Sequence, residues 1–137
     1  MSLVIDSSIT LAWFFEDERS AAADAVLRQV AESGAVVPSL WRLEVANALQ
    51  MAIRRQRIDA RFRDASIADL RALPIAIDAE TDRYAWGASL ILAERCQLTL
   101  YDAAYLELAQ RIGAPLATRD QPLRAAAKAI GIALKGD

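Results

Sequence analysis

The sequence contains no histidine and a single cysteine, Cys96. The lack of histidine excludes Ser–His and Cys–His nucleophile pairs and every histidine metal ligand. A single cysteine excludes an intrachain disulfide and any cysteine-rich zinc or iron–sulfur site. The longest mostly apolar stretch, Trp86 to Ala93, is far shorter than the roughly 20 residues that a bilayer-spanning helix needs. Any chemistry of this chain must therefore use carboxylates, hydroxyls, amides and arginines.

The charges are close to balanced. The 137 residues include 16 basic and 18 acidic side chains, a formal net charge of −2, so the chain as a whole is not a basic nucleic-acid binder. With 55% hydrophobic and 25% charged residues, the composition is that of a globular protein. No repeat, linker or change of composition divides the sequence, so we expect one domain over residues 1–137. No basic leader precedes the apolar run that ends at Asp6, which predicts a cytoplasmic protein.

Short apolar runs alternate with longer segments of helical composition. The predicted strands are 2–6, 35–38, 74–77, 114–117 and, as an edge strand, 131–134. The predicted helices are 9–15 with Ser7 and Ser8 as caps, 19–33, 40–56, 59–73, 81–95, 101–112 and 121–130. This alternation predicts an α/β fold, a parallel central sheet of four to five short strands flanked by helices. The functional site of such a sheet lies beyond the carboxyl ends of its strands.

Four carboxylates stand out because their neighbours are apolar or because they lie at element junctions: Asp6, Glu44, Asp102 and Asp120. Each aspartate also has a structural interpretation. Asp6 can end its strand by accepting backbone N–H bonds, Asp102 can be the acid of a capping box with Thr99, and Asp120 can begin a helix. Glu44 is harder to explain, because a carboxylate that faces a core is costly unless it is paired or bound to a metal.

Convergence of these carboxylates favours a functional interpretation. If Asp6 and Asp120 end strands of one parallel sheet, and Asp102 begins a helix at the same edge, all three point into one crevice. Two such charges 4 Å apart repel by about 4 kcal/mol at an effective dielectric constant near 20. A divalent cation offsets this cost, and oxygen-only ligands select Mg²⁺ or Mn²⁺. Such an ion activates water for hydrolysis of a phosphodiester without a histidine.

Three polar neighbours of these carboxylates have open roles. Asn47 follows Glu44 by three residues on the same helical face, where it either holds the carboxylate or is a semi-exposed helix side chain. Thr118 either orients a ligand through its hydroxyl or fills a strand end. Ser7 is better explained as a cap than as a nucleophile, because no base is available to activate it.

Arginine and aromatic side chains gather in two further places. Five arginines fall within ten residues that contain one acid: Arg54, Arg55, Arg57, Arg61 and Arg63. They form either an RNA-contacting patch or a solvated helix end. The consecutive aromatic residues Trp13 to Phe15 cannot all face one core, so at least one of them is a candidate for a partner groove or for burial between helices. Trp41, Trp86 and Cys96 are assigned to packing.

Four segments together resemble the PIN-domain family, and most closely its VapC-type toxins of bacterial toxin–antitoxin pairs. The segments are Val4–Ser8, Pro38–Leu49, Tyr101–Tyr105 and Leu116–Asp120. Each motif is weak alone, but four in order with this spacing are specific, and the resemblance runs from about Val4 to Leu134. It implies a PIN-like three-layer fold and a Mg²⁺- or Mn²⁺-dependent endoribonuclease whose carboxylate cluster is Asp6, Glu44, Asp102 and Asp120.

The same resemblance implies partners. It implies an RNA substrate, a homodimer, and a cognate VapB-like antitoxin whose tail blocks the site. The target does not carry over, because family members differ widely in the RNA that they cut.

Two other functions are open from the sequence. Phosphatases with an Asp nucleophile at the end of the first strand resemble Asp6 to Thr10, but they require a second Asp where this chain has Ser8. They also require a late lysine, for which only Lys128 and Lys135 are available. A PIN-like module that binds protein or RNA without catalysis is the other alternative. It predicts eroded carboxylates, whereas all four are present, so the nuclease ranks first.

Overall fold

The computed structural model describes residues 2–136 and places five short strands in one parallel sheet. In chain order the elements are β1 (Leu3–Ile5), α1 (Ser7–Ala12), the 3₁₀ helix η1 (Glu16–Glu18), α2 (Ala21–Ser33), β2 (Ala35–Val37), α3 (Trp41–Arg54), α4 (Ala60–Ala72), β3 (Ile75–Ile77), α5 (Thr81–Tyr84), α6 (Ala88–Cys96), α7 (Leu100–Ile112), β4 (Leu116–Ala117), α8 (Gln121–Ala129) and β5 (Leu134–Lys135). The predicted α/β class is confirmed, and each predicted strand overlaps an observed one.

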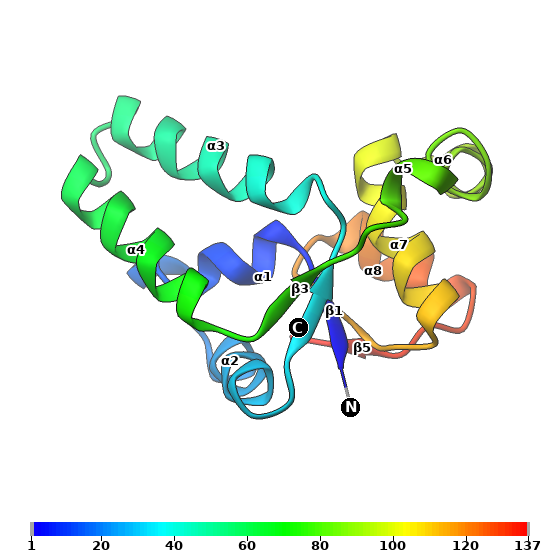
Figure 1. Cartoon of the computed structure of the whole chain (residues 1–137), viewed down its shortest axis with the longest axis horizontal. Helices are drawn as coiled ribbons and strands as arrows, with labels where there is room; N and C mark the ends of the chain where they lie inside the picture. Colours follow the sequence, from blue (N-terminus) through cyan, green and yellow to red (C-terminus); the bar gives the residue numbers. More distant parts are fainter. Residues whose placement is uncertain (1, 137) are drawn as a thin grey trace.

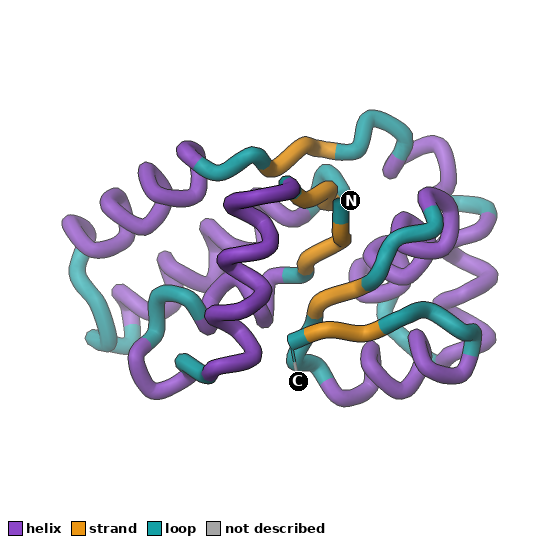
Figure 2. The backbone as a smooth tube through the Cα atoms, turned by 90° about the horizontal axis from the view of Figure 1, so that it is seen from below, coloured by secondary structure: helices purple, strands orange, loops and turns teal. Residues whose placement is uncertain are grey.

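The sheet lies between two groups of helices. Its strand order is β3-β2-β1-β4-β5, so the first strand of the chain is the central one. Helices α1 to α4 lie on one side and α5 to α8 on the other, with the strands running between them (Figures 1 and 2). β1 is fully buried in all three residues, as expected for a parallel strand covered on both faces. The carboxyl ends of β1 and β4 lie side by side, because Ile5 pairs with Ala117.

The helices begin and end at residues with clear physical reasons. Ser20, Asp59, Thr99 and Asp120 each accept a backbone N–H at the start of a helix, as good N-caps do. α3 buries Trp41, Val45, Leu49 and Ala52 on one face, which matches the 3.6-residue spacing of apolar residues expected of a helix packed against a core. No helix within residues 2–136 is both long enough and apolar enough to span a bilayer.

Three expectations about local structure were wrong. Ser7 and Ser8 lie inside α1 and do not cap it, because the Asp6 carboxylate takes that position and accepts the N–H of Ile9 at 3.1 Å. The predicted helix 81–95 is two helices, since the chain leaves helical geometry at Gly87 (φ −120°, ψ −108°). Trp86, assigned to packing, is 91% exposed at that break, whereas Trp41 is buried as expected.

Candidate active site at the carboxyl edge of the sheet

Asp6 lies at the centre of this edge and is only 4% exposed. It follows β1 directly, and its two carboxylate oxygens are both engaged. Oδ1 accepts the Ser8 hydroxyl at 2.7 Å and the Ile9 N–H at 3.1 Å, and Oδ2 accepts the Thr118 hydroxyl. The structural interpretation of Asp6 is therefore confirmed, since it does cap a helix. A cap requires only one acceptor oxygen, however. The second oxygen of Asp6 is held by Thr118, the residue that follows β4.

The hydroxyls of Ser8 and Thr118 connect two turns of the chain. Each donates to Asp6 and also accepts a backbone N–H from the turn after β4: Ser8 from Arg119 at 2.9 Å, Thr118 from Asp120 at 3.0 Å. Thr118 is fully buried. These bonds hold the turn after β1 against the turn after β4. Thr118 was a candidate from the sequence, but Ser8 was missed, and its only signal was a hydroxyl two residues after a strand-ending aspartate.

Glu44 reaches the same edge from α3. It lies in the first turn of that helix and is half-buried, and one of its oxygens, Oε1, accepts the hydroxyl of Tyr105 from α7. Asn47, considered as the residue that would hold this carboxylate, is exposed. Tyr105 was not predicted, because the two residues are 61 positions apart and nothing local connects them.

Asp102 and Asp120 complete the set from two helix starts. Asp102 lies in the first turn of α7, where its backbone N–H donates to the Thr99 hydroxyl at 3.1 Å. Asp120 caps α8 by accepting the Leu123 N–H at 2.9 Å. The structure thus brings all four predicted carboxylates to one edge of the sheet from four separate segments. Asp6 and Asp120 cap helices with their carboxylates, so for them the structural and the functional interpretations coexist; Asp102 takes part in the Thr99 cap through its backbone N–H.

The carboxylates affect one another electrostatically. Burial raises the pKa of Asp6, and the charge of Asp120 raises it further against the hydrogen bonds from Thr118, Ser8 and Ile9. Burial raises the pKa of Glu44, and Asp102 and Asp6 add to the shift while the Tyr105 hydroxyl opposes it. Burial and the charge of Asp120 raise the pKa of Asp102. Burial is the main cause of these shifts and like charge adds to each of them, so the four side chains share one negative field.

Basic side chains near this edge do not neutralise it. None of the four carboxylates forms an ion pair with any arginine or lysine that the structure describes. Arg119 donates to the carbonyl oxygen of Glu18, and Arg124 donates to the carbonyl oxygens of Thr118 and Lys135. An uncompensated set of oxygen donors suits a hard divalent cation. Within residues 2–136, however, no three such side chains are arranged so that they could already hold a metal ion.

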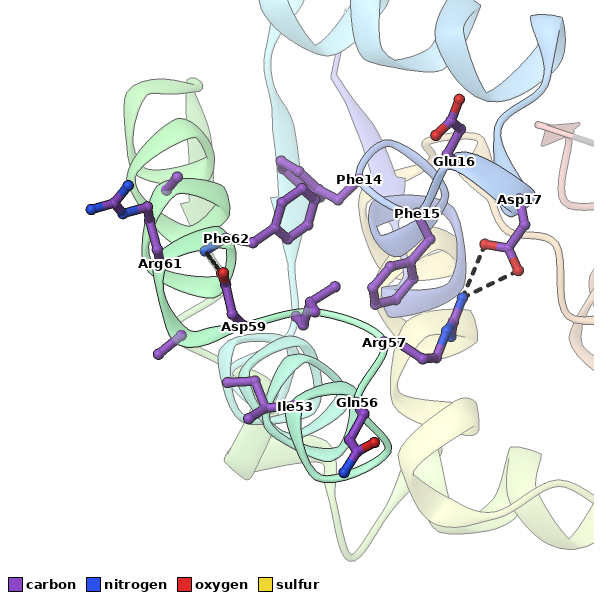
Figure 3. A pocket seen from close by; sticks show the side chains of 13 residues that line it. Phe14, Phe15, Glu16, Asp17, Ile53, Gln56, Arg57, Asp59, Arg61 and Phe62 are labelled. Carbon is purple, nitrogen blue, oxygen red and sulfur yellow. Dashed lines mark hydrogen bonds and ion pairs between the residues drawn. The ribbon is translucent and has the colours of Figure 1, made fainter.

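A groove lies between the α1–η1 segment and the α3–α4 pair, near the end of α3 that is remote from Glu44 (Figure 3). It has a volume of about 1410 Å³, and its apolar wall includes Phe14, Phe15, Ile53 and Phe62. Arg57 crosses one end, pairing with Asp17 at 3.0 Å while its guanidinium lies 4.4 Å from the centre of the Phe15 ring. The expectation that the three consecutive aromatics cannot all face one core was wrong: Trp13 and Phe15 are buried in it and Phe14 packs against it. Phe14 and Phe15 also line the groove.

The arginine-rich segment lies at the end of α3 that is remote from the carboxylates. Arg54 follows Glu44 by ten residues along that helix, which is about 15 Å at the usual rise. Arg57 and Arg63 are engaged with acidic partners, Asp17 and Asp64. Arg54, Arg55 and Arg61 are exposed, so contact of this patch with RNA stays a prediction.

Known proteins share this fold and sequence pattern. The chain is 33% identical over 127 residues to the ribonuclease VapC3 of Pyrobaculum aerophilum, covering 90% of this chain and 92% of that protein. The crystal structure of PAE2754 from the same organism superposes with a TM-score of 0.67 at 22% identity, over 98% of this chain and 89% of that one. VapC20 of Mycobacterium tuberculosis, described as a sarcin–ricin loop cleaving toxin, gives a TM-score of 0.60 at 18% identity, over 91% and 95%.

The family model described as PIN domain matches residues 3–129, nearly the whole chain. The match includes all four carboxylates and both hydroxyls that fix Asp6. This chain therefore belongs to the PIN-domain family.

Proposed function

We propose that this protein is a metal-dependent endoribonuclease that hydrolyses phosphodiester bonds in RNA, and that it is the toxin of a type II toxin–antitoxin pair. The carrying observation is the set of four carboxylates at one sheet edge, without a paired arginine or lysine among the described residues. The identity to a VapC ribonuclease over 90% of the chain supports the same conclusion. A non-catalytic module would have no reason to keep these repelling charges.

Asp6, Glu44, Asp102 and Asp120 would hold Mg²⁺ or Mn²⁺. Bound there, the ion would activate a water molecule and stabilise the charge that develops on the phosphodiester. Oxygens are available for it: Glu44 Oε2 and Asp120 Oδ1 accept no hydrogen bond from the described residues. Because no preformed site is present among these residues, binding requires the carboxylates to turn toward one another. The hydrogen bonds from Ser8 and Thr118 would hold Asp6 in place.

The test of this function is cleavage of RNA by the purified chain with Mn²⁺, with EDTA, and with Mn²⁺ restored in excess over EDTA. We expect cleavage only in the two samples that contain free Mn²⁺. Sequencing of new RNA 5′ ends in cells that briefly express the chain would identify the target. Cleavage that persists in EDTA would contradict the metal dependence. No new ends with a folded, metal-supplied protein would favour the binding module.

The groove in Figure 3 is our proposed place for the cognate VapB-like antitoxin, held as an amphipathic helix. Its apolar floor and charged rim match the two faces of such a helix. Phe62→Glu is expected to weaken the toxin–antitoxin complex at least tenfold, about 1.4 kcal/mol, in a calorimetric titration. Ile112→Glu is the matched control, since Ile112 is 42% exposed and Phe62 40%, but only Phe62 lines the groove. Equal affinity of both variants would contradict this assignment.

The homodimer that the family resemblance implies has a candidate surface at the start of α6. Trp86, in the turn before this helix, and Leu90 and Ile91, within it, are 91%, 51% and 57% exposed, a patch that an isolated domain rarely leaves bare. We propose that a second copy covers it. Light scattering should give a dimer mass for the wild-type chain and a monomer mass for Trp86→Glu, with Ile112→Glu unchanged. A monomeric wild-type chain would mean that this face has a different partner.

A further inference from the structure

Tyr105 is a fully enclosed phenol among the carboxylates. It is 1% exposed and lies on α7, one turn after Asp102, yet its hydroxyl points across the carboxyl edge to Glu44 of α3. This hydrogen bond joins helices from the two opposite layers of the fold (Figure 1). A buried tyrosine hydroxyl needs a partner, but a backbone carbonyl would serve that need without placing a charge beside it.

Glu44 is the one member of the cluster that takes no part in a helix cap. Asp6 and Asp120 are each held by a helix-start N–H, and Asp102 follows the cap residue Thr99. Glu44 has a long, half-buried side chain in the first turn of α3. The residue before it, Leu43, is 75% exposed, so this part of the helix borders solvent. The charges of Asp102 and Asp6 raise the pKa of Glu44 and so disfavour its ionised form beside them. The Tyr105 hydroxyl is the one described hydrogen-bond partner of its carboxylate.

From this geometry we propose that Tyr105 is a positioning residue of the proposed nuclease: it holds the Glu44 carboxylate in the cluster against the repulsion of its neighbours. Its bond engages Oε1 and leaves Oε2 for a cation. The inference rests on the proposed function, because it assigns Tyr105 a role in preparing that same site. Outer hydrogen-bond partners of metal-ligating side chains commonly change metal affinity 10- to 100-fold when they are removed.

The experiment measures Mn²⁺ affinity by calorimetry, without RNA, for four proteins: wild type, Tyr105→Phe, Glu44→Asp and the double variant. Glu44→Asp keeps the charge but shortens the side chain, so the same hydrogen bond is lost from its other end. We expect each single change to weaken Mn²⁺ binding about tenfold. The double variant should bind Mn²⁺ with the same affinity as the weaker-binding of the two single variants, because both changes break the same interaction.

Tyr101→Phe is the control, since it removes a phenol oxygen from the same helix at a position that is 64% exposed. Its affinity should match that of the wild type. A purely structural Tyr105 would lower the melting temperature of Tyr105→Phe but leave its Mn²⁺ affinity unchanged, and that result would overturn the proposal. Effects that multiply in the double variant would overturn it too.

The outcomes separate the two proposals. If Tyr105→Phe does not fold, unchanged Mn²⁺ affinity of the Glu44→Asp protein, which also loses this bond, still contradicts the positioning role. A wild-type chain that neither binds Mn²⁺ nor cleaves RNA defeats the proposed function and the positioning role with it. A wild-type chain that does both, beside an unaffected Tyr105→Phe, defeats the positioning role alone.

Discussion

Asp102→Asn is expected to reduce RNA cleavage by at least about a hundredfold, yet to leave the metal-free protein as stable as the wild type or more stable. Burial and the charge of Asp120 raise the pKa of Asp102 in the fold, which means that ionising this carboxylate costs folding free energy. Its stabilising contribution is complete below the unfolded pKa and is lost as pH rises through the folded pKa. At neutral pH the amide removes that cost. Cleavage rates with Mn²⁺ and thermal melts in EDTA measure the two effects.

Acid and a matched variant sharpen this test. Below the pKa of an unfolded aspartate, about 3.9, Asp102 is neutral in both states, so the stability difference between the variant and the wild type should shrink. Asp69→Asn, an exposed change on α4, should alter neither cleavage nor the melt by a measurable amount. A markedly less stable Asp102→Asn protein would mean that Asp102 acts mainly as a structural acid beside the Thr99 cap.

Arg111→Met is expected to lower the free energy of unfolding by about 3–5 kcal/mol. Arg111 lies between two largely buried carboxylates. Its guanidinium donates to Asp78 at 2.6 and 3.2 Å and to Glu107 at 2.8 and 3.1 Å, and it covers the Tyr84 ring at 4.6 Å. Methionine fills similar space but leaves both acids without a cation. Urea unfolding at pH 7, followed by circular dichroism, measures the loss.

The pH dependence of this effect has a definite sign. Burial raises the pKa of Asp78, but its bonds with Arg111, Glu80 and Thr81 more than offset that and hold the pKa below its ordinary value. The stabilisation is therefore present above the unfolded pKa and is lost as pH falls through the folded one. The difference between Arg111→Met and the wild type should narrow in acid. Arg83→Met removes an exposed pair with Glu80 and should cost at most about 1 kcal/mol; an equal loss for both variants would contradict the burial argument.

The strands of the sheet and the four carboxylates could be predicted from the sequence because both have local signals. Apolar runs predict strands, and an aspartate after such a run is visible within a few residues, as at Asp6 and Asp120. The strand order β3-β2-β1-β4-β5 was not predicted, because the alternation of short strands with helices indicates only that the sheet is parallel. Asp6 and Asp120 follow the carboxyl ends of β1 and β4, which are neighbours in the sheet. This is the edge at which the functional site was predicted.

The remaining features depend on distant or competing interactions. Tyr105 meets Glu44 only after α3 and α7 have packed on opposite sides of the sheet. The Asp6 cap displaced the two serines because a carboxylate at a strand end competes better for the first free N–H groups of a helix. Gly87 broke a helix that composition alone would continue, and the break exposed Trp86.

The position of β1 in the middle of the sheet bears on how this protein is made. Within this domain β1 cannot be enclosed until β4 is made, and the Thr118 hydroxyl that fixes Asp6 lies 112 residues further along the chain. Contacts of such separation form late in folding. During synthesis the growing chain therefore lacks the assembled carboxylate edge until its last elements emerge.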